Sequence, residues 1–178
     1  IYTSDQGFYL GDHGWFDKRW IYEESLRMPF IVYWPGVTEA GSKSDLIVQN
    51  IDFTPTMLSM AGLPIPSDIQ GEDLSPVLKG EMKDNLREYA YYHYYAYPDW
   101  HMVKPHLGIR SERYKLAHYY TIDEWELFDL EVDPDEMKSV YNVPEYENIK
   151  LSMKEALRKT KIEVGDTIMY KSSSKHFK

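Results

Sequence analysis

Short apolar runs, separated by glycine, proline and aspartate, make up the first part of this chain of 178 residues. Residues 1–3 have the character of a strand end, residues 21–28 of a short helix, and residues 30–34 of a buried strand closed by Pro-Gly. Residues 8–20 are too rich in Gly and Asp for regular structure, so we expect a loop there. This pattern predicts strand ends that lead into polar loops.

Two helices are predicted further along this first part. Thr54 is suited to cap a helix that has Pro55 at its first position and Gly62 just past its end. A shorter helix is predicted over residues 74–79, ending at Gly80.

The second part has strand composition and then one amphipathic stretch. We expect a strand over 89–95, a hairpin from 107–110 and 113–120, and a further strand over 125–130. Residues 144–163 predict a helix, because Ile149, Met153 and Leu157 recur every four positions among Lys and Glu. We therefore predict an α/β domain over residues 1–85, a small antiparallel subdomain with a closing helix over 86–170, and a flexible Ser/Lys-rich tail over 171–178.

The composition of the chain limits the kinds of partner that it can bind. A formal net charge of −9 argues against nucleic acid as a partner, although a local basic pocket can still bind an anionic sugar. The chain contains no cysteine, so it has no disulfide. No apolar run approaches the roughly 20 residues of a membrane span.

Candidate chemistry gathers in the first twenty residues. Asp5 and Gln6 follow a predicted strand end, where open α/β sheets place their active sites, and their oxygens suit Ca²⁺, or alternatively Mg²⁺. Lys18 lies thirteen positions after Asp5 and suits a tetrahedral oxyanion. Cation and lysine together indicate a site for a sulfate or phosphate ester.

Each of these residues also has a simpler interpretation. Asp5 could cap a turn, Lys18 could be a solvated surface lysine, and Arg19 a surface or supporting charge. His13 is as much a loop histidine bonded to the main chain as a catalytic residue of the site. Local sequence alone leaves these alternatives open.

Several segments stand in the order that sulfatases of the alkaline-phosphatase superfamily show, and the chain resembles that family nearly to residue 144. These segments are S-D-Q-G (4–7), L-G-D-H-G (10–14), Y-E-E (22–24), I-D-F-T-P-T (51–56) with A-G (61–62), G-E-D-L (71–74), G-I-R (108–110) with Y-K (114–115), and E-L-F-D-L (126–130) with D-P-D-E (133–136).

The resemblance implies specific roles for the candidate residues. It implies that Asp5 and Gln6 are ligands of Ca²⁺ and that Lys18 contacts the sulfate group. An amide at position 6 favours Ca²⁺ and a sulfate ester over zinc phosphatase chemistry. Glu126, Asp129 and Asp133 are interpreted as structural residues.

The family's nucleophile motif, C/S-x-P-x-R, does not occur in this chain. The resemblance therefore implies that the chain is the C-terminal portion of a longer enzyme, whose upstream remainder carries the formylglycine and further metal-binding acids. We expect this chain alone to be inactive. Family resemblance also implies an exported enzyme, whether periplasmic, extracellular or lysosomal.

Aromatic and imidazole groups gather between the predicted strands at 89–95 and 107–110, a combination that suits stacking on a sugar ring and bonding to its hydroxyls. This segment resembles bacterial carbohydrate sulfatases of the N-acetylglucosamine-6-sulfatase-like type. We predict that His101 and His106 face the substrate, a sulfated amino sugar or glycosaminoglycan fragment. The alternative is that these histidines only hold the loop in place.

Two other functions remain open at this point. One is a phosphodiesterase or phosphonate hydrolase of the same superfamily. The other is a non-catalytic sugar-binding module, against which the presence of Asp5, Gln6 and Lys18 argues.

Overall fold

The computed structural model describes residues 1–82 and 86–168, and these residues form two compact units. Unit 1 comprises Ile1–Asp5 and Met28–Ala90; unit 2 comprises Gln6–Arg27 and Tyr91 onward. The predicted domain boundary near residue 86 lies close to the point, after Ala90, where the chain passes from unit 1 to unit 2 for the last time. However, residues 6–27, which were predicted to belong with the first domain, pack into unit 2. The predicted flexible tail over 171–178 lies outside the described residues.

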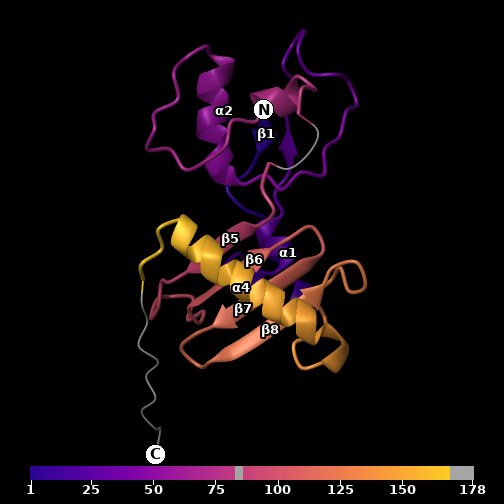
Figure 1. Ribbon diagram of the computed structural model, residues 1–178, viewed down its shortest axis with the longest axis vertical. Helices are drawn as coiled ribbons and strands as arrows, with labels where there is room; N and C mark the ends of the chain where they lie inside the picture. Colours follow the sequence, from indigo (N-terminus) through magenta and orange to yellow (C-terminus); the bar gives the residue numbers. More distant parts are fainter. Residues whose placement is uncertain (83–85, 169–178) are drawn as a thin grey trace, which may run out of the picture. The chain divides into compact units, whose positions relative to one another are not determined.

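Unit 1 contains a two-stranded antiparallel sheet and two helices (Figure 1). Its elements are β1 (Tyr2–Thr3), β4 (Phe30–Ile31), the 3₁₀ turn η2 (Asn50–Asp52), α2 (Phe53–Met60) and α3 (Ser75–Leu78). Tyr2 pairs with Ile31 and Thr3 with Phe30.

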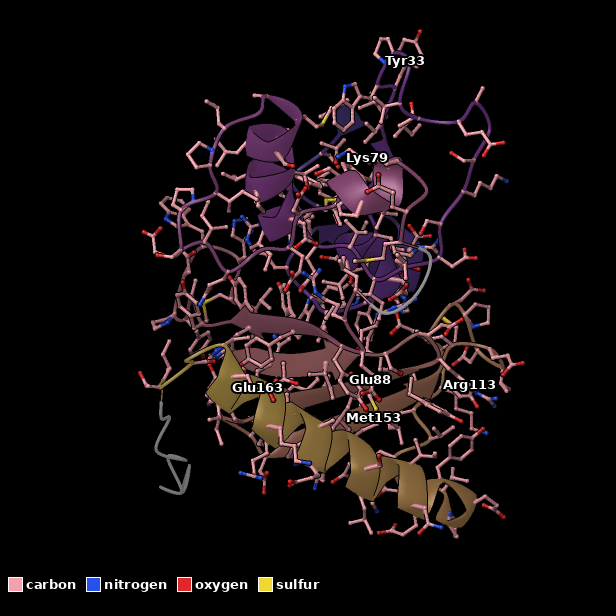
Figure 2. All side chains as sticks on the ribbon, turned by 45° about the horizontal axis from the view of Figure 1, so that its top comes forward. Tyr33, Lys79, Glu88, Arg113, Met153 and Glu163 are labelled. Atoms are coloured by element: carbon pink, nitrogen blue, oxygen red, sulfur yellow. The ribbon has the colours of Figure 1, made fainter. Side chains whose placement is uncertain are left out.

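The prediction of a buried strand over residues 30–34 is wrong for the described residues. The strand ends at Ile31, which is 62% exposed, and Tyr33 is 78% exposed at the edge of unit 1 (Figure 2). Among the described strands only β1 pairs with β4, and on one face the ring of Phe30 stacks on Phe53 at 4.8 Å. The apolar run is therefore only partly covered.

The predicted helix over residues 55–61 is present, but Thr54 does not cap it. Helix α2 begins two residues earlier, at Phe53, and follows directly on η2, so that Thr54 lies inside its first turn. Gly62 follows its end with a φ of 69°, as the sequence predicted. Helix α3 is present as predicted, and the Asp73 carboxylate accepts the N–H of Ser75 at its start.

Unit 2 is built on a four-stranded antiparallel sheet in the order β5-β6-β7-β8, over which α4 lies (Figure 1). The elements of this unit are β2 (Tyr9–Leu10), η1 (Asp12–Gly14), β3 (Phe16–Asp17), α1 (Glu23–Leu26), β5 (Ala90–Tyr94), β6 (His106–Arg110), β7 (Tyr114–Tyr119), β8 (Glu124–Asp129), η3 (Pro144–Tyr146) and α4 (Glu147–Glu163). The predicted hairpin, flanking strands and final helix are confirmed.

Helix α4 covers the sheet with the predicted apolar stripe. Met153 faces the strands in Figure 2 and is 3% exposed, and Leu157 is 5% exposed. At roughly 1.5–3 kcal/mol for each fully buried large apolar side chain, these two residues contribute much of the helix's docking energy. Among the described residues, no helix is both long and apolar enough to cross a membrane.

Residues 8–20, predicted to lack regular structure, form a small antiparallel hairpin. Strands β2 and β3 pair Tyr9 with Asp17 and Leu10 with Phe16. The Tyr9 side chain is completely buried and anchors the hairpin in unit 2, while Leu10 and Phe16 remain exposed. The hairpin gives a defined geometry to the segment that carries Lys18.

Candidate functional site

Asp5 follows β1 at the end of the first segment of unit 1. Asp5 is exposed, and its main-chain carbonyl accepts a hydrogen bond from the side-chain amide of Asn50 at 3.3 Å. An open surface hollow of ≈ 500 Å³ lies here, lined by Thr3, Ser4, Asp5, Asn50, Ile51 and Phe53. The carboxylate of Asp5 is therefore accessible from solvent.

Gln6 is the first residue of unit 2, whereas Asp5 ends the first segment of unit 1, so the two predicted metal ligands belong to different units. Gln6 is half-buried, and its side chain hydrogen-bonds the Tyr92 hydroxyl. Gly7 donates its N–H to the carbonyl of Ser25 at 2.8 Å. A Cβ at position 7 would lie 2.0 Å from the carbonyl oxygen of Glu24, so no other residue fits this approach to α1.

The donor chemistry of Asp5 and Gln6 fits calcium, since both offer hard oxygens. Calcium takes 6–8 oxygen ligands, and among the described residues no group of three or more His, Cys, Asp or Glu side chains is arranged to hold a metal. The pair can supply two ligands of a larger set.

His13 is held by its surroundings rather than projecting freely. Its backbone has a positive φ of 55°, its ring stacks on Tyr22 at 4.6 Å, and its Nε2 lies 3.3 Å from the carboxylate of Glu24. This geometry supports the interpretation of His13 as a fixed loop residue. Its predicted catalytic role stays a prediction.

Lys18 directly follows β3 and is half-buried. The buried Ser25 hydroxyl donates to the main-chain carbonyl of Lys18 at 2.8 Å, and the Tyr92 hydroxyl donates to that of Arg19 at 2.9 Å. Burial raises the pKa of Tyr92 to about 12, so this donor keeps its proton at neutral pH. The main chain around Lys18 is therefore tied to both α1 and β5.

The predicted substrate residue His101 lies on a turn between β5 and β6. Its Nδ1 lies 2.8 Å from the carboxylate of Asp17, which also pairs with Arg19. The His101 side chain is 40% exposed, so the rest of its ring remains accessible. Trp100 beside it is 97% exposed.

His106 does not have the position predicted for it. It is the first residue of β6 and 0% exposed, and its ring lies 5.0 to 5.7 Å from those of Trp20, Tyr92, Tyr94 and Tyr119. Burial lowers its pKa to about 4, and its Nδ1 bonds the carbonyl of Lys104 at 2.7 Å. The burial argues against contact with a sugar and favours the alternative, that His106 holds the loop.

A buried cluster of charges joins three of the sequence motifs. The Nζ atom of Lys115, 0% exposed, lies 2.7 Å from Glu23 and 2.8 Å from Glu136. Glu136 also accepts the N–H of Glu23 at 2.6 Å, and Arg110 lies 3.3 Å from Glu23. Burial raises the pKa of Glu136; for Glu23 burial acts in the same direction, but Lys115 and Arg110 lower its pKa overall.

Asp52 organises unit 1 in a similar way. Its completely buried carboxylate binds the Arg87 guanidinium through two contacts of 2.5 and 2.6 Å and accepts the N–H groups of Gln49 and Glu72. The Thr56 hydroxyl donates to the Asp52 carbonyl at 2.6 Å and accepts the N–H of Leu74. The D-x-x-P-T segment thus holds α2 to the chain before α3.

Comparison with known proteins adds the relationship that this geometry alone does not give. A sequence model described as N-sulphoglucosamine sulphohydrolase, C-terminal, matches residues 11–163. The chain is 50% identical over 169 residues to an N-acetylglucosamine-6-O-sulfatase of Bacteroides thetaiotaomicron, covering 93% of this chain and 30% of that protein. It is 31% identical over 150 residues to an arylsulfatase of Clostridium perfringens, covering 82% of this chain and 30% of the relative.

The chain belongs to the sulfatase family. A solved structure described as a complex with its substrate D-glucosamine-2-N,6-O-disulfate matches with a TM-score of 0.89 and 50% identity, over 93% of this chain and 34% of that one. A phosphonate monoester hydrolase from Silicibacter pomeroyi shares the fold, with a TM-score of 0.78 at 23% identity over 93% of this chain and 35% of that one. This sulfatase chain therefore spans about a third of the length of the relatives that it matches.

The family motifs in this sulfatase chain divide into two kinds. Y-E-E, Y-K and D-P-D-E meet in the buried charge cluster and hold unit 2 together. Glu126 accepts the hydroxyls of Tyr22 and Tyr119, and Asp129 binds Arg113 through two contacts of 2.8 Å, so their predicted structural roles are confirmed. In the segment from Asp5 to Lys18, by contrast, Asp5 is exposed and Gln6 and Lys18 are half-buried.

Two contributors were missed by sequence reasoning. Asp17 lies in the predicted loop and Tyr92 in the predicted strand over 89–95, and neither was a candidate, although Asp17 contacts His101 and Tyr92 holds the main chain next to Lys18. Position 17 adjoins the candidate lysine, which was a usable signal. Nothing local distinguishes Tyr92 from the tyrosines around it.

Proposed function

We propose that this chain is the C-terminal part of a formylglycine-dependent sulfatase that removes the 6-O-sulfate from a glucosamine-type sugar. The observation that carries the proposal is the 50% identity to an N-acetylglucosamine-6-O-sulfatase across 93% of the chain, with Asp5, Gln6 and Lys18 all present. The resemblance to sulfatases also supports an exported enzyme.

In this proposal Lys18 binds the sulfate group. Its ammonium donates hydrogen bonds to sulfate oxygens and opposes the negative charge that grows on the leaving ester oxygen. Ser25 holds the main chain of Lys18 and Tyr92 holds that of Arg19, so little reorganisation is needed when substrate binds. His13, stacked on Tyr22, keeps a set orientation beside this segment, where it can exchange a proton with the substrate.

Asp5 and Gln6 would hold a Ca²⁺ ion, with Mg²⁺ as the alternative, together with ligands from the rest of the enzyme. When bound, the ion would neutralise charge on the sulfate oxygens. The exposed position of Asp5 suits contact with such an ion, and the bond from Gln6 to Tyr92 orients the amide.

Sugar selection falls, in this proposal, to the turn that carries Trp100 and His101. A fully exposed indole offers a stacking face for a sugar ring, and the half-exposed imidazole offers an edge for hydroxyls. The buried His106, which is the first residue of β6, supports this turn through the bond from its Nδ1 to the carbonyl of Lys104. A phosphonate hydrolase function is not favoured, because that likeness is at the level of fold, with 23% identity.

The experiment is sulfate release by the complete enzyme, measured by ion chromatography on N-acetylglucosamine carrying sulfate at position 6, at position 3 or at position 4. We expect release from the 6-sulfate at least about tenfold faster in kcat/KM than from the other two. A methylphosphonate monoester of p-nitrophenol serves as the competing substrate. Faster turnover of that phosphonate than of every sulfated sugar would overturn the proposal.

A further inference from the structure

Asp17 has an unusual backbone conformation directly before Lys18. Its φ of 94° lies in the left-handed region that favours glycine, although it is an aspartate with a full side chain. Such a conformation is strained for a residue with a side chain and persists only where the surroundings hold it. The contacts of the Asp17 carboxylate provide such surroundings.

The Asp17 carboxylate contacts two side chains from different segments. Arg19 pairs with it from two residues along the chain, and His101 Nδ1 lies 2.8 Å from it across 84 positions. Its side chain is 25% exposed, so these contacts are partly shielded from water. The strained residue is therefore fastened at its side chain as well as through the pairing of β3 with β2.

The main chain at and after Asp17 is held at every residue up to Arg19. Asp17 is paired with the buried Tyr9 across the hairpin, the carbonyl of Lys18 accepts Ser25, and that of Arg19 accepts Tyr92. The backbone at Asp17 decides the direction in which the next residue leaves the strand. Lys18 is that residue.

We propose that Asp17 is a positioning residue for Lys18, and that its contact with His101 couples the sugar-selecting turn to the lysine that binds sulfate. This inference rests on the proposed function of Lys18. It assigns His101 a second task, because the ring nitrogen that pairs with Asp17 is directed to the hairpin and not to a sugar. Movement of the turn on binding a sugar would then shift Asp17 and change the direction in which Lys18 leaves the strand.

The decisive variant is Asp17→Gly in the complete enzyme, because glycine adopts the same φ without strain and lacks the carboxylate. We expect kcat on the 6-sulfated sugar to fall by roughly tenfold while KM changes by less than about threefold. In a Lys18→Ala background the same change should lower kcat by less than about twofold, since a residue that acts through Lys18 has nothing left to position. Asp17→Asn keeps an oxygen for both partners and should recover part of the loss.

The chain offers a matched control. Asp123 also has a positive φ, of 53°, and its carboxylate lies 3.0 Å from His118, but it belongs to the turn between β7 and β8. Asp123→Gly should change kcat by less than about twofold, whatever it does to the melting temperature. This control separates positioning from a general loss of stability.

The outcomes distinguish the two proposals. If the unmodified enzyme releases no sulfate, the proposed function fails and this inference fails with it. If it is active but Asp17→Gly stays within about twofold of it, only the inference is overturned. A full additional loss in the Lys18→Ala background, or an equal loss of kcat in Asp123→Gly, would also overturn it.

Discussion

Replacing Lys115 by Met removes the buried cation that two carboxylates share. Lys115 is 0% exposed, and methionine fills much of the same space without the charge. Glu23 keeps Arg110 at 3.3 Å, but Glu136 loses the ammonium at 2.8 Å and remains buried. Leaving a buried charge unpaired costs about 3–5 kcal/mol, which is a large part of the 5–15 kcal/mol stability of an ordinary domain.

Hydrogen exchange of β7 amides measures this loss within unit 2, where a single melting temperature would mix several parts of the enzyme. A cost of 3–5 kcal/mol corresponds to a fall in protection of roughly 150- to 5,000-fold in Tyr114–Tyr119. Adding Glu136→Gln should restore a large part of this protection. The neutral amide needs no counter-ion, and its oxygen can still accept the N–H of Glu23.

The effect should also depend on pH, with a definite sign. Burial already raises the pKa of Glu136, and removal of Lys115 raises it further. A carboxyl with a raised folded-state pKa binds its proton more readily in the folded state, so the destabilisation is greatest above that pKa and shrinks as the pH falls through it. The loss should therefore be larger near pH 8 than near pH 5.

Lys154→Met is the control, since this lysine lies 4.0 Å over the Trp125 ring, an interaction worth no more than about 1 kcal/mol at a partly exposed site. Protection in β7 that falls by less than tenfold in Lys115→Met, or equally in both variants, would refute the reasoning.

Two further substitutions test other buried groups. Asp52→Ala should destabilise unit 1 by about 3–5 kcal/mol, because it leaves the Arg87 guanidinium and two main-chain N–H groups without their acceptor. The loss is measured as reduced hydrogen-exchange protection in α2, and an effect below about 1 kcal/mol would show that water replaces the carboxylate. His106→Phe should make the stability less sensitive to acid. A histidine with a folded-state pKa of about 4 costs the native enzyme about 1.4 kcal/mol per pH unit as the pH falls from its unfolded pKa near 6.5 to that value. Parallel pH profiles of wild type and variant in urea unfolding would contradict this.

Periodicity predicted the elements of unit 2 well because their burial is regular. Met153 and Leu157 lie four residues apart on α4, and the strands after residue 89 alternate with turns of ordinary composition. The same reasoning was wrong for residues 30–34, since an apolar run shows that a segment can be buried but not what covers it. Thr54 misled for a similar reason, because the preceding 3₁₀ turn supplies the start of α2 instead of a cap.

The candidate site was predictable only in part. Asp5, Gln6 and Lys18 stand within 14 residues, so their order alone identifies the segment. The residues that hold this segment in place lie far away in the sequence, since Asp17 meets His101 across 84 positions and Glu23 meets Glu136 across 113. Such pairings depend on how the sheet folds, and single-sequence patterns do not contain that information.

The histidines show the limit most clearly. Sugar sites and aromatic cores use the same residue types, and the segment from residue 93 to 106 contains both. His101 lies half-exposed on a turn, while His106, five residues later, is enclosed by Trp20 and three tyrosines. The composition predicted a cluster of aromatic and imidazole side chains. Which of them are exposed and which are buried depends on how the strands pair.

In the proposed function this chain supplies Lys18, the lysine that binds the transferred sulfate. This role is tested by kcat/KM for sulfate release from 6-O-sulfated N-acetylglucosamine, measured for the complete enzyme and for its Lys18→Ala variant. We predict a loss of at least tenfold, equivalent to about 1.4 kcal/mol or more of transition-state stabilisation, with an unchanged melting temperature. Activity of the variant within about twofold of the unmodified enzyme would show that Lys18 is a surface lysine and contradict the account.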